Sequence, residues 1–233
     1  MTNIIANQDL VTTLLKKINL TIIKLDNSYL INPHLGLFDK KTQQKILSYY
    51  KYTDQLIAFA SSLLQKYYLA NLAQVVPSQL HIEFTQHHKP YIAKPATINL
   101  KFNISHCYNY VVLATYEGAD YEIGVDIEMV NNNININEMS SIVFSATEQK
   151  LIDNSQYNFF KLWTKKEALI KAMGTGFTTD FYKDTQLNLS TLETQNDYTI
   201  ITYTLENYFL SVCLRSCGLH VQGDRDSGVY ATL

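Results

Sequence analysis

Two carboxylates stand two residues apart in a short alternating stretch, at Asp126 and Glu128. Ile123, Val125 and Ile127 occupy the apolar positions of the same alternation. This pattern predicts a β-strand that buries the apolar residues and holds both carboxylates on its other face, roughly 6.6 Å apart. Carboxylates this close repel unless a cation lies between them, and Mg²⁺ commonly binds one or two carboxylates together with substrate phosphates. An ordinary half-exposed strand with an acidic solvent face is the alternative.

A second set of charged residues lies in a stretch with helical periodicity, residues 158–173, for which Gly174 is the predicted C-terminal stop. One face of this helix carries the positions i, i+4, i+7 and i+8, which are Trp163, Glu167, Ile170 and Lys171. A solvated Glu–Lys pair, which stabilises a helix by about 0.2–0.5 kcal/mol, is the alternative explanation. The apolar neighbours instead place Glu167 and Lys171 beside the core, where a third carboxylate and an ammonium suit a metal–phosphate site.

Polar residues that could hold phosphate oxygens occur upstream, near the predicted ends of extended segments. They are Lys89, Ser105 and His106, with an ammonium, a hydroxyl and an imidazole group. Adjacent residues of a strand face opposite ways, so Ser105 and His106 do not form a hydrolase motif. The two arginines, Arg215 and Arg225, lie near the C-terminal end. Phosphate binding elsewhere in the chain therefore depends on lysine, histidine, hydroxyl and backbone amide groups.

The elements that must position these residues follow from the periodicity. The first third reads as a short N-terminal strand or two, followed by helix over residues 40–72. Prolines then bracket short extended pieces. Strands are predicted over residues 100–104, 110–116 and 123–129.

The second part of the chain repeats this order. Asparagine-rich residues 131–137 predict a loop, and a capping box formed by Ser145 and Glu148 predicts the start of a short helix. The helix over residues 158–173 follows, and then a hairpin over residues 198–214.

The predicted elements thus form two successive groups, each with helix followed by strands, which predicts an α+β fold. We expect two similar halves meeting near residue 115, one over residues 1–115 and one over residues 116–214. Residues 215–233 hold both arginines and three of the eight glycines, so we expect this tail to lie outside the core.

The composition fits a globular protein, because 46% of the 233 residues are apolar and 12% are aromatic. A formal net charge of -2 indicates no nucleic-acid partner, and no apolar run is long enough for a membrane span. Three cysteines without metal-site spacing indicate free thiols in a reducing compartment. Since the N-terminus also lacks a secretory signal pattern, we expect a cytoplasmic protein.

Four motifs resemble, in order and spacing, those of the 4'-phosphopantetheinyl transferase family. They are residues 89–90, 102–106, 124–128 and 163–171, and the resemblance extends from His88 to Phe177. The last two motifs are highly specific together, whereas the first two are weak alone. The chain length and the helical region before the acidic strand resemble the larger surfactin-type members. This resemblance implies a monomer whose two similar α+β halves form a pseudo-twofold arrangement.

The resemblance also implies an activity, the transfer of 4'-phosphopantetheine from coenzyme A to a serine of an acyl or peptidyl carrier protein. It implies that Asp126, Glu128 and Glu167 hold Mg²⁺, with Mn²⁺ as an alternative, against the coenzyme A pyrophosphate. The implied catalytic residues are Asp126, Glu167 and Lys171. Glu167, or a metal-bound water beside it, would take the serine proton, while Lys171 would contact the phosphates. The implied coenzyme A-binding residues are Lys45, Lys89, Pro90, Ser105, His106 and Lys171.

Two positions depart from the family pattern. His88 stands where the family usually has a glycine before Lys-Pro, so this turn is expected to differ. Residues 57–61 replace a segment in which the family commonly shows an arginine, which leaves Lys45 as the best upstream basic residue. Weaker binding of coenzyme A through the first half is therefore expected.

Two other functions stay open at this stage. A different metal-dependent enzyme acting on phosphoanhydrides would use the same three carboxylates and would release adenosine bisphosphate from coenzyme A without a carrier. A non-catalytic scaffold that binds carrier proteins would bind no coenzyme A.

The carrier itself is not identified, and Lys161, Lys165 and Lys166 are candidate docking residues for an acidic carrier, with a solvated helix face as the alternative.

Overall fold

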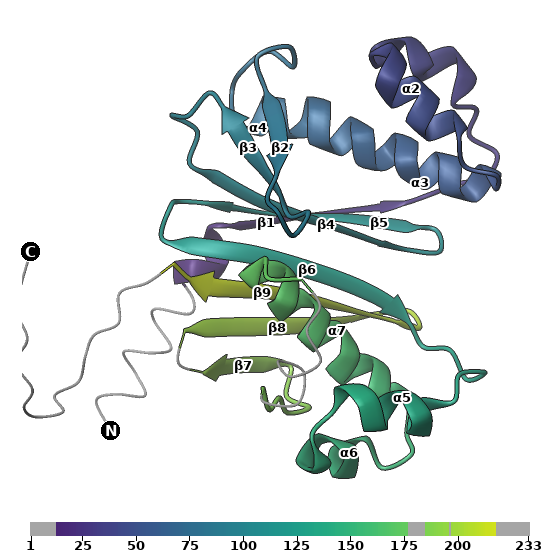
Figure 1. Ribbon diagram of the computed structural model, residues 1–233, viewed down its shortest axis with the longest axis vertical. Helices are drawn as coiled ribbons and strands as arrows, with labels where there is room; N and C mark the ends of the chain where they lie inside the picture. Colours follow the sequence, from purple (N-terminus) through teal and green to yellow (C-terminus); the bar gives the residue numbers. More distant parts are fainter. Residues whose placement is uncertain (1–12, 177–184, 196, 218–233) are drawn as a thin grey trace, which may run out of the picture.

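The computed structural model describes residues 13–176, 185–195 and 197–217. These residues form the predicted mixture of helices and antiparallel sheets. In Figure 1 the helices of the first part lie above a first sheet, the second sheet lies below it, and the long helix α7 lies across the second sheet. The relation between two halves by a pseudo-twofold axis stays a prediction.

The helical layer occupies most of the region that the periodicity marked as helix. Its elements are a 3₁₀ helix (Asn32–Leu37), α2 (Lys40–Leu47), α3 (Tyr52–Leu63), a π-helical turn (Leu64–Tyr68) and α4 (Leu69–Leu72). The side chain of Asp39 caps α2 by accepting a 2.8 Å hydrogen bond from the Thr42 amide, which satisfies one free donor of the first turn. The predicted single helix is therefore interrupted at residues 48–51, and from Tyr52 to Leu72 it is continuous through the π-helical turn.

The first sheet has the strand order β1-β5-β4, and a separate two-stranded hairpin lies beside it. The elements are β1 (Ile18–Lys24), β4 (Leu100–Cys107), β5 (Tyr110–Glu117), and the hairpin strands β2 (His81–Phe84) and β3 (Pro90–Lys94). Leu113 and Phe102 bury one face of the sheet against Leu64 and neighbouring side chains of the helical layer.

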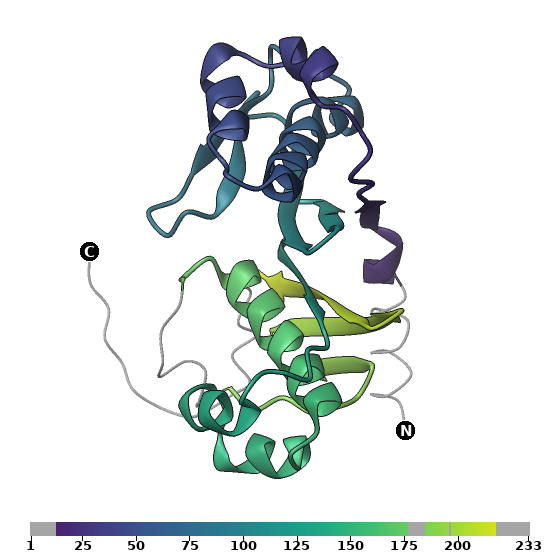
Figure 2. The ribbon, with the colours of Figure 1, turned by 90° about the vertical axis from the view of Figure 1, so that its right-hand side faces the viewer.

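The second sheet has the strand order β6-β9-β8-β7, and all its pairs are antiparallel. Its strands are β6 (Tyr121–Met129), β7 (Leu192–Gln195), β8 (Tyr198–Leu205) and β9 (Tyr208–Ser216). The helices of this part are α5 (Ile136–Val143), α6 (Ala146–Ile152) and α7 (Gln156–Met173). Helix α7 covers one face of the sheet, and its C-terminal end points toward the β2–β3 hairpin (Figure 2).

The two sheets pack against each other through apolar side chains. Val112 and Ala114 of β5 belong to one buried cluster with Val125 of β6 and Val212 of β9. Ile123 and Ile127 join the same cluster and are 0% and 1% exposed, which confirms that the apolar positions of the acidic strand enter the core. Since burying each such side chain is worth about 1.5–3 kcal/mol, this cluster anchors β6 and the direction of its carboxylates.

Most of the element predictions are confirmed. The capping box of Ser145 and Glu148 is present in full, and Gly174 ends α7 with φ +68°, which glycine adopts without strain. Helix α5 differs from expectation, because it begins inside the predicted loop, after Asn135 as its N-cap. Strand β9 includes residues 215 and 216, which had been expected in the tail.

Phe177 and residues 218–233 lie outside the described residues, and the domain boundaries stay predictions. No helix in the described ranges combines the length and apolar character that a membrane span requires.

Candidate functional site

Strand β4 contacts β6 through the side chains of every second residue, although the two strands belong to different sheets. Ser105 Oγ lies 3.0 Å from Asp126 Oδ1, and Cys107 Sγ lies 3.5 Å from Glu128 Oε2. The four contacts of this β4–β6 row are Lys101 with Glu122, Asn103 with the Val125 amide, Ser105 with Asp126, and Cys107 with Glu128. The row therefore holds both predicted carboxylates from the side of the first sheet.

Asp126 is 4% exposed and lies at the centre of the site. The Lys171 ammonium donates to Asp126 Oδ1 at 2.6 Å and to Ser105 Oγ at 3.1 Å. Strand β4, strand β6 and helix α7 thus each contribute one side chain to this contact. The other carboxylate oxygen, Asp126 Oδ2, is buried and has no hydrogen-bond partner among the described residues. A buried oxygen of this kind calls for a cation or donor that comes from elsewhere.

Glu128 lies on the same face of β6 as Asp126. Burial, and next the negative charge of Asp126, raise the pKa of Glu128 to about 7, while donation from Cys107 and from the Trp163 indole opposes the rise. The proximity of the two carboxylates, with the charge of Asp126 raising the pKa of Glu128, favours a cation between them.

The structure tests the metal prediction in part. Asp126 and Glu128, with one unpartnered buried oxygen and a raised pKa, fit a hard divalent cation. Among the described residues, no three His, Cys, Asp or Glu side chains form a group that could hold a metal ion. The full ligand set with Glu167 therefore stays a prediction.

Gly124 explains how α7 comes close enough to β6 to reach Asp126. A Cβ atom at this position would collide with the Ala168 carbonyl and the Ala172 amide of α7. A glycine in a strand permits close approach of another backbone, and here the approaching element is the backbone of α7.

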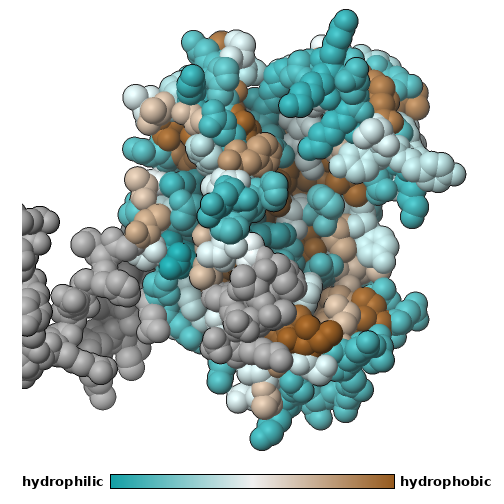
Figure 3. Space-filling view, in the orientation of Figure 1, coloured by the Kyte–Doolittle hydropathy of each residue, from teal (hydrophilic) through white to brown (hydrophobic). Residues whose placement is uncertain are grey.

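Two cavities lie beside this centre, between the helical layer, β4 and the end of α7. The larger, of about 600 Å³, is lined by residues of α2 and α3 and by His106. The smaller, of about 340 Å³, is lined by the hairpin, Lys171 and the glycines after α7. Lys45 and Ile104 line both, so the cavities adjoin. Figure 3 shows apolar side chains in the hollow between α2 and the hairpin, within a hydrophilic surround.

The predicted phosphate-binding residues are distributed unevenly around these cavities. Lys45 and His106 line them, as does Lys171. Partial removal from water and the Lys171 charge lower the pKa of His106, which is opposed by Asp126 and Asp54. Ser105 is buried against Asp126 and Lys171.

Lys89 and Pro90 also line the smaller cavity, but the Lys89 ammonium has partners within the protein. It donates at 2.7 Å to Glu122 Oε2 and at 2.7 Å to the Ala172 carbonyl oxygen. His88 adopts φ +62°, the left-handed region in which the family's usual glycine has no strain. The turn thus keeps the conformation that glycine favours.

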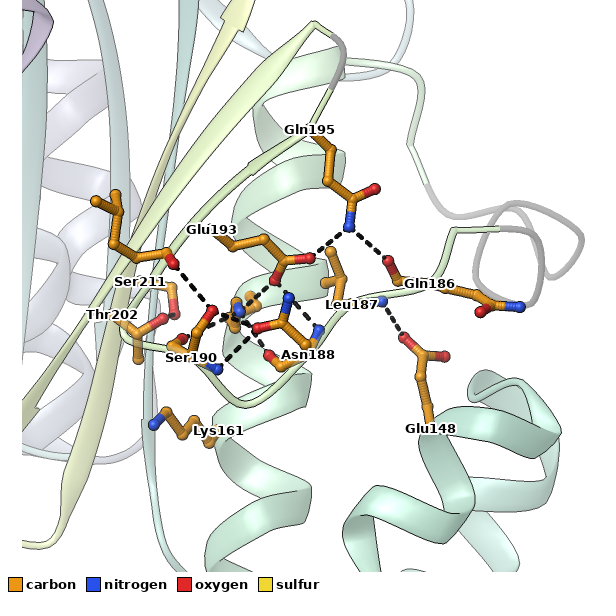
Figure 4. A network of polar contacts seen from close by, with 12 residues as sticks. Glu148, Lys161, Gln186, Leu187, Asn188, Ser190, Glu193, Gln195, Thr202 and Ser211 are labelled. Carbon is orange, nitrogen blue, oxygen red and sulfur yellow. Dashed lines mark hydrogen bonds and ion pairs between the residues drawn. The ribbon is translucent and has the colours of Figure 1, made fainter. Parts of the chain in front are cut away.

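Lys165 and Lys166 are not docking residues, because both side chains are completely buried. Lys165 forms an ion pair with Glu193 and donates to the Asn188 carbonyl at 2.6 Å, and Lys166 lies 2.8 Å from Glu148. Figure 4 shows the network that ties the segment before β7 to α6 and α7. Burial of this kind is tolerated only when the charges are paired and hydrogen-bonded.

These buried ion pairs had no clear signal in the sequence. Glu148 accepts from Lys166, from the Ser145 amide and from the Leu187 amide, so a residue predicted only as a helix cap also holds α7. Glu122 had not been singled out either. Its position two residues before Gly124 on the same face of β6 is the one signal that could have found it.

Comparison with known proteins gives two family matches along the chain. The model described as "4'-phosphopantetheinyl transferase, N-terminal" matches residues 31–118, and the model of the 4'-phosphopantetheinyl transferase superfamily matches residues 122–216. The two matches divide the chain at the turn between β5 and β6.

Several curated proteins are similar to this chain at modest identity. The 4'-phosphopantetheinyl transferase gsp of Aneurinibacillus migulanus is 28% identical over 84% of this chain and 85% of its own length. The 4'-phosphopantetheinyl transferase Sfp of Bacillus subtilis is 24% identical over 77% of this chain and 83% of its own. The L-aminoadipate-semialdehyde dehydrogenase-phosphopantetheinyl transferase of Schizosaccharomyces pombe is 32% identical, over 63% of this chain and 62% of its own.

Proposed function

Because this chain belongs to the 4'-phosphopantetheinyl transferase superfamily, we propose that it transfers the phosphopantetheine arm of coenzyme A to a serine hydroxyl of an acyl or peptidyl carrier protein. Relatives of this chain are named 4'-phosphopantetheinyl transferases, which supports phosphopantetheine as the transferred group. Action as a cytoplasmic monomer is part of the same proposal.

The contact of Lys171 with Asp126, at the edge of the smaller cavity, is the observation that carries the proposal. Phosphoryl transfer depends mostly on positioning and on neutralising charge at the phosphates. Lys45, Lys171 and two histidines of the hairpin line this cavity, so it suits a group with several negative charges. The adjoining larger cavity, with its mixture of apolar and polar residues, offers room for the rest of a nucleotide.

Asp126 and Glu128, together with Glu167, would hold Mg²⁺ or Mn²⁺ at this edge. The bound ion supplies neutralisation of charge on the coenzyme A pyrophosphate. The unpartnered oxygen of Asp126 and the raised pKa of Glu128 support this assignment.

The remaining roles belong to side chains of this protein. Glu167 would accept the proton from the carrier serine, whose oxygen then attacks the phosphorus that carries the pantetheine arm. The bond from this phosphorus to the bridging oxygen breaks, and adenosine 3',5'-bisphosphate leaves. Lys171 would stabilise the negative charge that develops on the leaving group, while Lys45, Ser105 and His106 would hold the nucleotide end.

Intact-mass measurement tests this function. The chain is incubated with coenzyme A, Mg²⁺ and a panel of apo acyl and peptidyl carriers, and we expect at least one carrier to gain the mass of one phosphopantetheine group. Reactions without carrier serve as controls. Release of adenosine bisphosphate in these controls would indicate a hydrolase instead, and no gain on any carrier would oppose the proposal.

A further inference from the structure

Lys89 joins three parts of the molecule that lie far apart in the sequence. It lies directly before β3, its ammonium donates to Glu122 of β6, and the same ammonium donates to the Ala172 carbonyl in the last turn of α7. Lys101 of β4 reaches the other oxygen of Glu122 at 2.6 Å. We call Lys89, Lys101, Glu122 and the Ala172 carbonyl the Lys89 clamp.

Lys89 lines the smaller cavity, and the clamp connects the two walls of this cavity. One wall is the β2–β3 hairpin, with Phe84, His87 and His88, and the other is the end of α7, with Ile170 and Lys171. The amide and carbonyl of Lys89 are also part of the hairpin, because they bond to the Thr85 hydroxyl and amide at 3.2 and 2.9 Å. Lys89 is therefore rigidly attached to one wall through its backbone and to the other through its side chain.

The packing around the clamp leaves the ammonium little freedom to turn toward the cavity. The Lys89 side chain is only 11% exposed, and a Cβ atom at Gly174 would meet Lys89 Cδ at 2.9 Å. The Ala172 carbonyl belongs to the last turn of α7, where carbonyl groups have no partner within the helix and favour a cation. The Glu122 carboxylate beside it would also repel a phosphate placed within reach of Lys89.

We propose that Lys89 is a positioning residue, which sets the distance between the hairpin and the end of α7 and so shapes the phosphate cavity without touching the phosphates. The proposal rests on the proposed function only in taking coenzyme A as the ligand. It replaces the expectation from the family resemblance that Lys89 itself binds coenzyme A.

Hydrogen exchange tests the clamp without any reference to activity. The variants are Lys89→Met, which removes the ammonium and keeps the stem, and Glu122→Leu, which removes its carboxylate partner. We expect both to speed exchange at the backbone amide of residue 89 in the hairpin and at the Gly174 amide after α7, while amides in the middle of β5 are unchanged. Lys94→Met, at the exposed far end of β3, serves as the matched control and should change neither. Unchanged exchange at these amides in both variants would overturn the proposal that the clamp holds the two walls together.

Steady-state kinetics distinguish positioning from direct binding. If Lys89 positions the walls, both variants should raise KM for coenzyme A about tenfold with a smaller change in kcat, and the double variant should be no more than about twofold worse than either one, because the two changes break the same contact. The inhibition constant of inorganic pyrophosphate, which is small enough to bind without both walls, should stay within about twofold.

Direct binding gives the opposite pattern. Lys89→Met would then weaken both coenzyme A and pyrophosphate, whereas Glu122→Leu would leave binding unchanged or tighten it, because it frees the ammonium and removes a negative charge. This pattern would overturn the proposal. A wild-type protein that transfers nothing would count against the proposed function alone, since the exchange experiment still decides whether the clamp exists.

Discussion

The Nζ atom of Lys171 lies 2.6 Å from Oδ1 of Asp126, so the last turns of α7 are bonded to the middle of β6. Ser105 completes the contact from β4, with its hydroxyl 3.0 Å from the same oxygen. Each of the three side chains therefore restrains the other two, and the site is already shaped before a substrate binds.

If Asp126 has the proposed role, replacing it with asparagine is expected to lower the rate of transfer by about 10²–10³-fold, since the proposed metal ion and Lys171 would both lose a negatively charged partner. The protein should remain folded, because asparagine has nearly the same shape and still accepts from Ser105. Intact-mass assays with circular dichroism as the folding check measure both quantities. Activity within tenfold of the wild type would show that Asp126 is not central.

Glu128→Gln should separate activity from stability. Its carboxylate is partly buried beside Asp126, and its raised pKa indicates that its charge is unfavourable in the metal-free protein. We therefore expect the free energy of unfolding to stay within about 0.5 kcal/mol of the wild type or to rise, while the Mg²⁺ concentration needed for half-maximal activity increases at least about tenfold. Glu117→Gln, at an exposed position ending β5, is the control and should alter neither.

Lys166→Met should destabilise the protein by about 3–5 kcal/mol, because it leaves the completely buried Glu148 carboxylate without its cation. Urea unfolding provides the measurement. The control is Lys150→Met on the exposed side of α6, for which a change within about 0.5 kcal/mol is expected. Equal effects of the two substitutions would mean that the buried pair is not important for the fold.

Gly124→Ala tests whether the approach of α7 to β6 is as tight as described. One added methyl group meets the backbone of α7 at Ala168 and Ala172, which cannot rotate away as a side chain could. We expect a loss of about 1–3 kcal/mol in stability and a loss of activity that persists well below the melting temperature. A variant with wild-type activity would disprove the contact.

Glu122 should contribute a stability that depends on pH. Its pKa is lowered, since the ammonium groups of Lys101 and Lys89 outweigh the opposing effect of burial. The unfolded chain then binds the proton more readily, so this contribution is complete above the ordinary pKa of about 4.3 and disappears as the pH falls through the lower folded value. Unfolding curves of the wild type and Glu122→Gln should therefore differ at neutral pH and converge on acidification. A difference in the free energy of unfolding that stays constant with pH would contradict the stabilising role of the Glu122 charge.

The sequence predicted those parts of the site that depend on local pattern. The alternation predicted that Asp126 and Glu128 share one face of a strand, and the capping box predicted the start of α6. Each of these signals lies within a few residues of the structure that it describes, which is why it could be read without coordinates.

The parts that were missed depend on contacts between distant segments. Lys165 and Lys166 have the composition of a solvated helix face. Their burial is tolerable because other elements supply Glu193 and Glu148 as ion-pair partners, together with carbonyl groups that accept from the two ammonium groups. Strand β7 was not predicted, since its four residues are defined by pairing with β8. The partners of Lys89 lie 33 and 83 residues further along the chain, beyond the reach of any local pattern.

The β4–β6 row has a consequence for which changes in chain length this protein can accept. A shift of β4 by one residue would turn all four of its side chains in the row to the opposite face, and a shift of β6 would do the same to its three carboxylates. The row therefore fixes the register between the two sheets. Insertions inside β4 or β6 should therefore be lost from natural variants. The short turn between β5 and β6, which takes no part in the row, is where added residues should accumulate.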